Sequence, residues 1–149
     1  MLNIEEILKM WKEDSTIDEF QLDQATIKIA KLHSKYLELI TYTKIRRKKK
    51  DLDFKKLLKD KWLYYNGKLS REEIDLKEWQ YDPFGGLNKP LKGDMNYYYD
   101  ADDDIQKAQA ELEYFKVLEE TLKEIIDTIR WRHQSIGNII KWRSFEAGV

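Results

Sequence analysis

A dense run of basic residues, followed at once by aromatic ones, is the part of the sequence best suited to binding chemistry. Between Lys44 and Lys61, ten lysines and arginines stand against three aspartates, a local charge of +7. The rest of the chain carries 17 basic and 25 acidic side chains, so the formal net charge of −1 hides a marked separation of charge. Such a separation creates a local positive field that suits a polyanion, either nucleic acid or an acidic membrane surface.

The spacing of these lysines fits one face of a helix. Each helical residue advances by about 100°, which places four lysines within an arc of about 60°: Lys44, Lys48, Lys55 and Lys59. Lys49 and Lys56 widen the arc. A stripe of ammonium groups along one helix can follow a phosphate backbone. Lys61, two residues after Lys59, points elsewhere on an ideal helix.

The aromatic residues Trp62, Tyr64 and Tyr65 follow the basic segment directly. The two tyrosines offer π faces on which unstacked bases can lie, although core packing is the alternative for both. For Trp62 we expect core packing. Phosphate contacts and stacking carry no sequence specificity, and no helix-turn-helix or zinc-finger pattern is present. The candidate DNA-binding residues are Lys59, Lys61, Lys55, Lys56, Lys48, Lys49, Lys44, Arg46, Arg47, Tyr64, Tyr65 and Lys68.

The elements that position these residues are expected to be helical. Two prolines and six glycines in 149 residues leave little to interrupt long helices. We expect a mostly α chain forming one domain over residues 1–149. Its parts are two long helices over about 21–66 and 101–145, a short N-terminal helix over 2–11, and an irregular connector over 68–99.

Local signals define the ends of these elements. Asn66-Gly67 is a natural stop for the first long helix, because glycine tolerates the left-handed conformation that ends helices. Within the connector, residues 71–79 could form a short helix and residues 95–99 a β-strand. Aspartates from Asp100 to Asp104 are typical of a capped, acidic helix start. The apolar stripe that follows repeats at 3–4 spacing, which indicates contacts between subunits as well as within one chain.

The sequence gives no sign of catalysis or of a bound cofactor. It contains no cysteine, its histidines His33 and His133 lack companions at metal-binding spacing, and no GxxxxGK[ST] loop is present. We therefore expect neither an enzyme nor a metal or cofactor site. No stretch approaches the roughly 20 apolar residues of a membrane span, so we expect a soluble, cytosolic protein.

Several short segments resemble the UvsY family of recombination mediators from T-even-type bacteriophages. The family has a Leu-Lys-x-Arg element just before Tyr-Tyr-Ser-Gly, and this chain has Leu58-Lys59-Asp60-Lys61 followed by Tyr64-Tyr65-Asn66-Gly67. Shorter similarities lie at Ile17-Asp18, Ser34-Lys35-Tyr36-Leu37 and Phe145-Glu146-Ala147-Gly148. The segments cover most of the chain as islands, and their order and spacing make the resemblance specific.

The resemblance implies a protein that is not an enzyme. It implies binding of single-stranded DNA, a closed, ring-like homo-oligomer of the hexamer or heptamer class, and contacts with a recombinase and a single-strand-binding protein. It also implies that Lys59 and Lys61 contact DNA, with Lys61 in place of the family's arginine and so without its planar fork. The location it implies is the cytoplasm of an infected host cell. The loop from Pro83 to Pro90 has no equivalent in the family pattern.

Two alternatives remain open. The chain could be a helical oligomeric scaffold or adaptor whose basic stripe is only solvated, in which case it would not bind DNA. It could also bind anionic lipid through the basic helix. The membrane alternative is disfavoured because the face opposite the stripe carries Arg46, Lys50 and Lys61 beside few apolar residues, whereas a lipid-inserting helix needs a cleaner apolar face.

Overall fold

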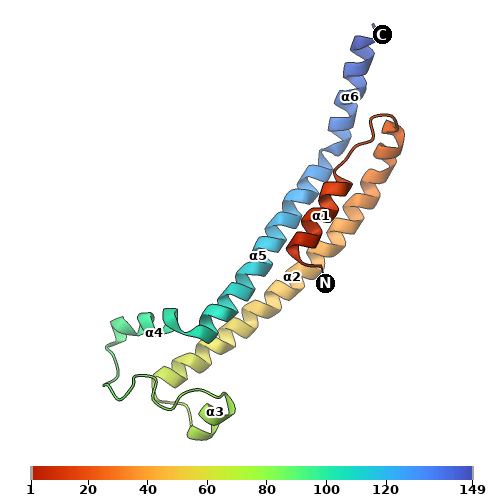
Figure 1. Ribbon diagram of the computed structural model, residues 1–149. Helices are drawn as coiled ribbons and strands as arrows, with labels where there is room; N and C mark the ends of the chain where they lie inside the picture. Colours follow the sequence, from red (N-terminus) through yellow and green to blue (C-terminus); the bar gives the residue numbers. More distant parts are fainter. Residues whose placement is uncertain (1, 149) are drawn as a thin grey trace. The chain divides into compact units, whose positions relative to one another are not determined.

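The computed structural model describes residues 2–148, and among these residues it contains helices and no β-strand. The helices are α1 (Ile4–Asp14), α2 (Leu22–Tyr65), α3 (Arg71–Leu76), a short 3₁₀ helix (Lys92–Asp94), α4 (Met95–Ala101), α5 (Asp103–Arg130) and α6 (Arg132–Glu146) (Figure 1). The prediction of a mostly α chain with two long helices is confirmed. The second of these helices is divided at Trp131 into α5 and α6.

The expected β-strand at residues 95–99 is wrong, because these residues begin α4. A lone β-strand leaves its backbone N–H and C=O groups without partners, whereas a helix satisfies most of them locally. The short helix expected in the connector is present as α3, where the side chain of Ser70 accepts a hydrogen bond from the Glu73 backbone N–H. All regular secondary structure in the described connector is therefore helical.

The chain forms two compact units, and the first comprises residues 1–45 and 115–149. Its core joins apolar side chains of α1, α2 and α5, among them Ile7, Tyr36, Leu118, Leu122 and Ile129, all essentially inaccessible to solvent. Burial of this kind contributes roughly 25 cal/mol per Å² of apolar surface. The first unit is therefore held by the apolar stripes that the sequence periodicity indicates.

Polar contacts fasten the α1–α2 turn to the first unit. Asp14 accepts hydrogen bonds from the Lys35 ammonium at 2.6 Å and from the Tyr36 hydroxyl at 2.8 Å. The buried guanidinium of Arg132 donates to the carbonyl oxygens of Ser15 and Thr16 at 3.3 and 3.1 Å. These contacts give the short turn a fixed path between its two helices.

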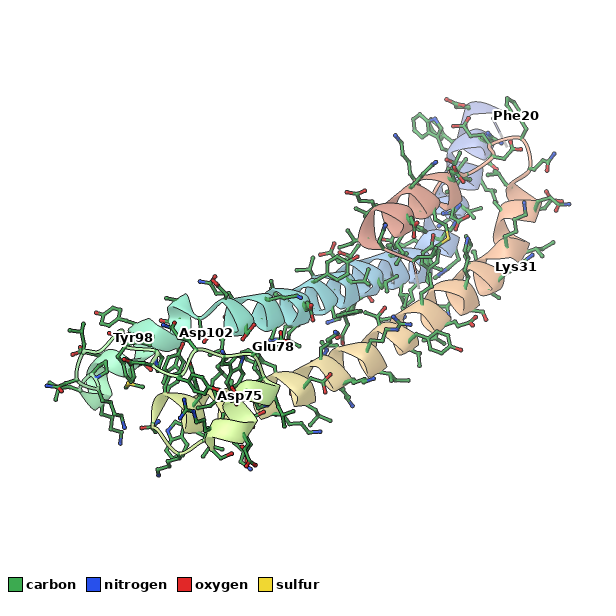
Figure 2. The ribbon with its side chains drawn as sticks, turned by 60° about the horizontal axis from the view of Figure 1, so that its bottom comes forward. Phe20, Lys31, Asp75, Glu78, Tyr98 and Asp102 are labelled. Atoms are coloured by element: carbon green, nitrogen blue, oxygen red, sulfur yellow. The ribbon has the colours of Figure 1, made fainter. Side chains whose placement is uncertain are left out.

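The second unit comprises residues 46–114 and contains the basic segment and the connector. Its core is largely aromatic: Tyr64, Tyr65 and Met95 are buried, and Trp79, Phe84, Tyr98 and Tyr99 pack around them. Figure 2 labels Tyr98, which lies in α4, and Asp102, which directly follows α4. The connector is therefore packed against the end of α2 through this aromatic cluster.

Candidate nucleic-acid interface

The C-terminal part of α2 carries the basic segment on a single continuous helix. From Arg46 onward these residues belong to the second unit, and Lys44 precedes them in the first. Within the basic segment, six side chains of the second unit are exposed: Arg46, Lys48, Lys49, Lys55, Lys56 and Lys59. Arg47 and Lys50 are half-buried, and Lys44 and Lys68 are exposed. Most of the predicted stripe is therefore accessible to a polyanion.

Few carboxylates neutralise the basic segment. Lys55 pairs with Asp51 at 3.1 Å, and Lys50 pairs with Glu111 at 3.1 Å. Within residues 2–148, no ion pair is formed by Lys48, Lys49, Lys56 or Lys59. Exposed cations that form no ion pair leave a positive field at the surface, which attracts a polyanion and weakens as salt is added. We define the basic face as the exposed residues Lys48, Lys55 and Lys59 with their neighbours Lys49 and Lys56.

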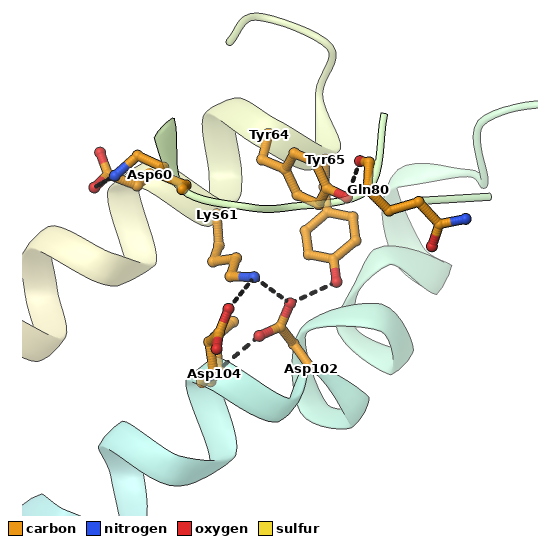
Figure 3. A network of polar contacts seen from close by, with 9 residues as sticks. Asp60, Lys61, Tyr64, Tyr65, Gln80, Asp102 and Asp104 are labelled. Carbon is orange, nitrogen blue, oxygen red and sulfur yellow. Dashed lines mark hydrogen bonds and ion pairs between the residues drawn. The ribbon is translucent and has the colours of Figure 1, made fainter. Parts of the chain in front are cut away.

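Lys61, which the resemblance implies contacts DNA, is buried inside the second unit and does not lie on the basic face. Its side chain is 4% exposed, and its ammonium lies 2.9 Å from a carboxylate oxygen of Asp102 and 2.9 Å from one of Asp104 (Figure 3). The same ammonium lies 3.9 Å from the centroid of the Trp79 ring. The physical reason is the helical rotation of about 200° between Lys59 and Lys61, which turns Lys61 toward the interior of the second unit.

Asp102 is the centre of the contacts around Lys61. It accepts hydrogen bonds from the Tyr65 hydroxyl at 2.7 Å and from the Ile105 backbone N–H at 3.0 Å, so it also caps α5. Burial acts to raise the pKa of Asp102, but the hydrogen bonds from Tyr65, Ile105 and Lys61 outweigh it, and the pKa lies below its ordinary value. Burial and the hydrogen bond to Asp102 raise the pKa of Tyr65. The buried network therefore holds an ionised carboxylate beside a neutral phenol.

The sequence indicated Asp102 only as part of a capped helix start. Its second role depends on a contact with Lys61, which is 41 residues away along the chain. Spacing within one helix gives no signal for a partner so distant. A lysine on the core-facing side of α2 was the one available hint, because a buried ammonium needs a carboxylate nearby.

For Tyr64 and Tyr65 the sequence leaves both a stacking surface and core packing open, and the structure places both rings in the core. They are 7% and 8% exposed, and their ring centroids lie 5.0 Å apart. The Tyr64 hydroxyl donates to the backbone carbonyl of Gln80 (Figure 3). Because both rings are packed against the connector, the core alternative holds for them in this structure.

The sequence predicts core packing for Trp62, but the structure leaves its ring partly exposed. Its side chain is 46% exposed. The Lys68 ammonium lies 4.6 Å from the centroid of its ring. Trp62 follows Lys59 by three residues and Lys55 by seven, a spacing that places it on the same side of a helix as both lysines. That spacing was the available signal for its exposure.

Neither a metal site nor a membrane span is found in the described part of the chain. Residues 2–148 contain no cluster of three or more histidine, aspartate or glutamate side chains arranged to hold a metal ion. None of the helices described is both long enough and apolar enough to cross a bilayer.

Comparisons with known proteins give a consistent result. The family model for “Recombination, repair and ssDNA binding protein UvsY” matches residues 10–149. The chain is 25% identical over 147 residues to the recombination protein UvsY of Enterobacteria phage T4, covering 99% of each protein. A crystal structure of the bacteriophage T4 recombination mediator protein UvsY matches at a TM-score of 0.83 and 24% identity, covering 99% of both chains. A second crystal form of that protein matches at a TM-score of 0.79 and 24% identity, covering 93% of this chain and 97% of the other.

Proposed function

Because the chain belongs to the UvsY family of recombination, repair and single-stranded-DNA-binding proteins, we propose that it acts as a recombination mediator. In this proposal it binds single-stranded DNA without sequence preference and helps a recombinase to load onto strands coated by a single-strand-binding protein. The family description names binding, recombination and repair, and it names no catalysed reaction.

The observation that carries the proposal is the exposed, largely unpaired basic face of α2. Lys48, Lys55 and Lys59 project from one side of the helix, and the two lysines beside them widen that side. Lysine contacts to phosphates position a protein on a strand but do not read its sequence. Arg46 and Arg47 add positive charge to other sides of the same helix segment, and Lys68 lies beyond its end. Lys44, in the first unit, is a further candidate contact for DNA.

We further propose that copies of the chain assemble into a ring-like homo-oligomer of the hexamer or heptamer class. The exposed apolar side chains of α6 support an interface between subunits, since Trp142 is 62% and Phe145 75% exposed, with their rings stacked at 5.7 Å. A ring multiplies weak contacts, because each further subunit binds the same strand at a high effective concentration.

Mediation requires no covalent chemistry in this scheme. A strand held along the basic faces of several subunits is extended and partly unstacked. Such a strand is a poorer ligand for the competing coat protein and a better one for the recombinase. The excess of acidic side chains outside the basic segment is available to protein partners. The site of action in this proposal is the cytoplasm of an infected host cell.

The test is binding of fluorescent oligo-dT across a salt series by the wild type and a Lys48→Ala/Lys55→Ala/Lys59→Ala variant. Each neutralised phosphate contributes about −0.7 to the log–log salt slope on a single strand, so the variant's slope should be flatter. The matched control is Lys107→Ala, which removes an exposed lysine of the second unit that lies outside the basic face. Loading is then measured as the lag before a DNA-dependent recombinase becomes active on a coated strand, which the wild type should shorten.

The alternative of a helical scaffold predicts oligomers without affinity for DNA. Failure of the wild type to bind oligo-dT at low salt would favour it and contradict the mediator proposal. Binding to anionic vesicles in place of DNA would favour the membrane alternative.

A further inference from the structure

Trp62 occupies an unusual position for a large aromatic side chain. It lies in the last turn of α2, beside Tyr64 and Tyr65, which are buried, yet almost half of its own surface is exposed. An indole ring left at the surface of a small helical unit is typical of a contact site, because removing it from water in the complex is favourable.

The position of Trp62 relative to the basic face is set by helix geometry. Seven residues correspond to nearly two full turns, so Trp62 projects within about 20° of the direction of Lys55. Lys59 lies one turn before it on the same side. A strand whose phosphates follow Lys55 and Lys59 along the helix therefore reaches the indole at the end of the helix.

Lys68 supplies a further positive charge at this point. Its ammonium lies over the Trp62 ring at 4.6 Å from the centroid, a cation–π contact that restrains the ring. A restrained ring loses less conformational freedom when a base stacks on it, so binding costs less entropy. The Lys68 ammonium can also contact a phosphate of the same strand. Trp62 thus combines an exposed ring with a cation at 4.6 Å from its centroid and with Lys59 one helical turn before it.

We propose that Trp62 is the base-stacking residue of the DNA-binding surface, and that it receives an unstacked nucleobase at the end of the strand segment held by Lys55 and Lys59. This inference rests on the proposed single-strand binding. It assigns stacking to Trp62 in place of Tyr64 and Tyr65, whose rings are packed in the connector cluster. Any of the four bases can stack there, since each has a π face.

The experiment separates base contacts from phosphate contacts by using two strands. Wild type, Trp62→Ala, Trp62→Leu and Trp62→Phe are titrated with oligo-dT and with an abasic strand of equal length that keeps the phosphates. Loss of one stacked base should weaken oligo-dT binding by at least about fivefold in Trp62→Ala. Trp62→Leu, which keeps an apolar side chain but no ring, should be weakened similarly, whereas Trp62→Phe should retain most of the affinity.

Two further readouts distinguish stacking from a structural role. The abasic strand should bind Trp62→Ala as tightly as it binds the wild type, and the salt slope on oligo-dT should not change, because no charge has been removed. Oligomer mass should also be unchanged. An equal loss on both strands, a changed mass, or full affinity in Trp62→Ala would overturn the inference.

The failure of this inference is distinguishable from failure of the proposed function. If Trp62→Ala binds oligo-dT normally while the triple lysine variant does not, the stacking role is wrong and the DNA-binding role of the basic face stands. If the wild type binds neither strand, the proposed function itself fails.

Discussion

Lys59 and Lys61 are two residues apart, and the structure gives them opposite environments. Lys59 projects into solvent from the basic face, whereas Lys61 is buried between Asp102 and Asp104. The ammonium of Lys61 therefore neutralises carboxylates of its own chain and anchors the start of α5 to the end of α2. Any effect of a Lys61 substitution on DNA binding should arise through the fold of the second unit.

The first prediction concerns the stability contributed by Lys61. Lys61→Met should lower the free energy of unfolding by about 3–5 kcal/mol, because it leaves the buried Asp102 carboxylate without its cation. Lys59→Met, at an exposed site, should change it by no more than about 0.5 kcal/mol. Urea unfolding at one fixed protein concentration checks both values. A Lys61→Met protein that is as stable as the wild type yet binds DNA weakly would contradict this assignment.

The second prediction concerns pH. The folded-state pKa of Asp102 lies below its ordinary value of 3.8, so its ionised form stabilises the fold. This contribution is complete above the unfolded pKa, near pH 4, and is lost as pH falls through the folded pKa. Asp102→Asn lacks this ionisation and should be less stable than the wild type at neutral pH. Urea midpoints measured from about pH 7 down to about pH 3 should show the difference shrinking in acid. A difference that is constant over this range would indicate that the charge of Asp102 does not contribute.

The end of α2 shows how one glycine sets the path into the connector. Gly67 adopts a positive φ of 68°, and the backbone N–H groups of Gly67 and Lys68 donate to the carbonyls of Tyr64 and Leu63. This pattern of hydrogen bonds closes the last turn of a helix and requires a left-handed residue. It turns the chain sharply after the basic helix and directs Lys68 back toward Trp62.

The third prediction tests this helix end. Gly67→Ala should destabilise the protein by about 1–2 kcal/mol, the cost of a left-handed conformation for a residue with a Cβ atom. A Cβ at Gly67 would meet no atom within 4 Å, so crowding adds nothing to this cost. Gly93→Ala is the control, because Gly93 is equally uncrowded but has no positive φ. Thermal or urea unfolding measures both variants, and equal effects would argue against a conformational role for Gly67.

The helices and the connector differ in how far the sequence alone predicts them. The bounds of α2 follow from local signals, since apolar periodicity runs without a proline or glycine until Gly67. The connector depends on contacts that are distant in sequence, such as Tyr65 with Asp102 and Tyr64 with Trp79. Local propensity therefore favoured a β-strand at residues 95–99, where packing against this cluster selects a helix.

The candidate site likewise combines residues placed by local spacing with residues placed by distant contacts. The exposed lysines were predictable because helical spacing alone determines their common face. The same spacing places Trp62 on that face. The burial of Tyr64 and Tyr65 was not predictable, because it depends on where the connector returns to the last turn of α2.

For the whole molecule, the proposed ring links the two compact units to one function. The first unit carries the exposed apolar side chains of α6, and the second carries the basic face. Oligomerisation through α6 would raise the affinity of each basic face for a shared strand without any new DNA contact. DNA affinity should therefore depend on assembly.

The fourth prediction follows from this dependence. Trp142→Glu/Phe145→Glu should reduce the oligomer mass, and its affinity for a long oligo-dT should fall by roughly 10²- to 10⁴-fold as multivalency is lost. Leu76→Glu, at an exposed apolar position on α3, should leave the mass unchanged. Light scattering and anisotropy titrations measure mass and affinity. An intact oligomer in the double variant would place the subunit interface elsewhere.

The most direct measurement of the DNA-binding surface is lysine acetylation read by mass spectrometry, with and without saturating oligo-dT. Lys48, Lys55 and Lys59 should react in the free protein and be protected by DNA, whereas Lys107 should react equally in both conditions. Lys61 should react poorly in either condition, because its ammonium is buried in ion pairs. The account would be contradicted if Lys61 were acetylated readily and protected by DNA, while the acetylation of Lys48, Lys55 and Lys59 did not change when DNA was added.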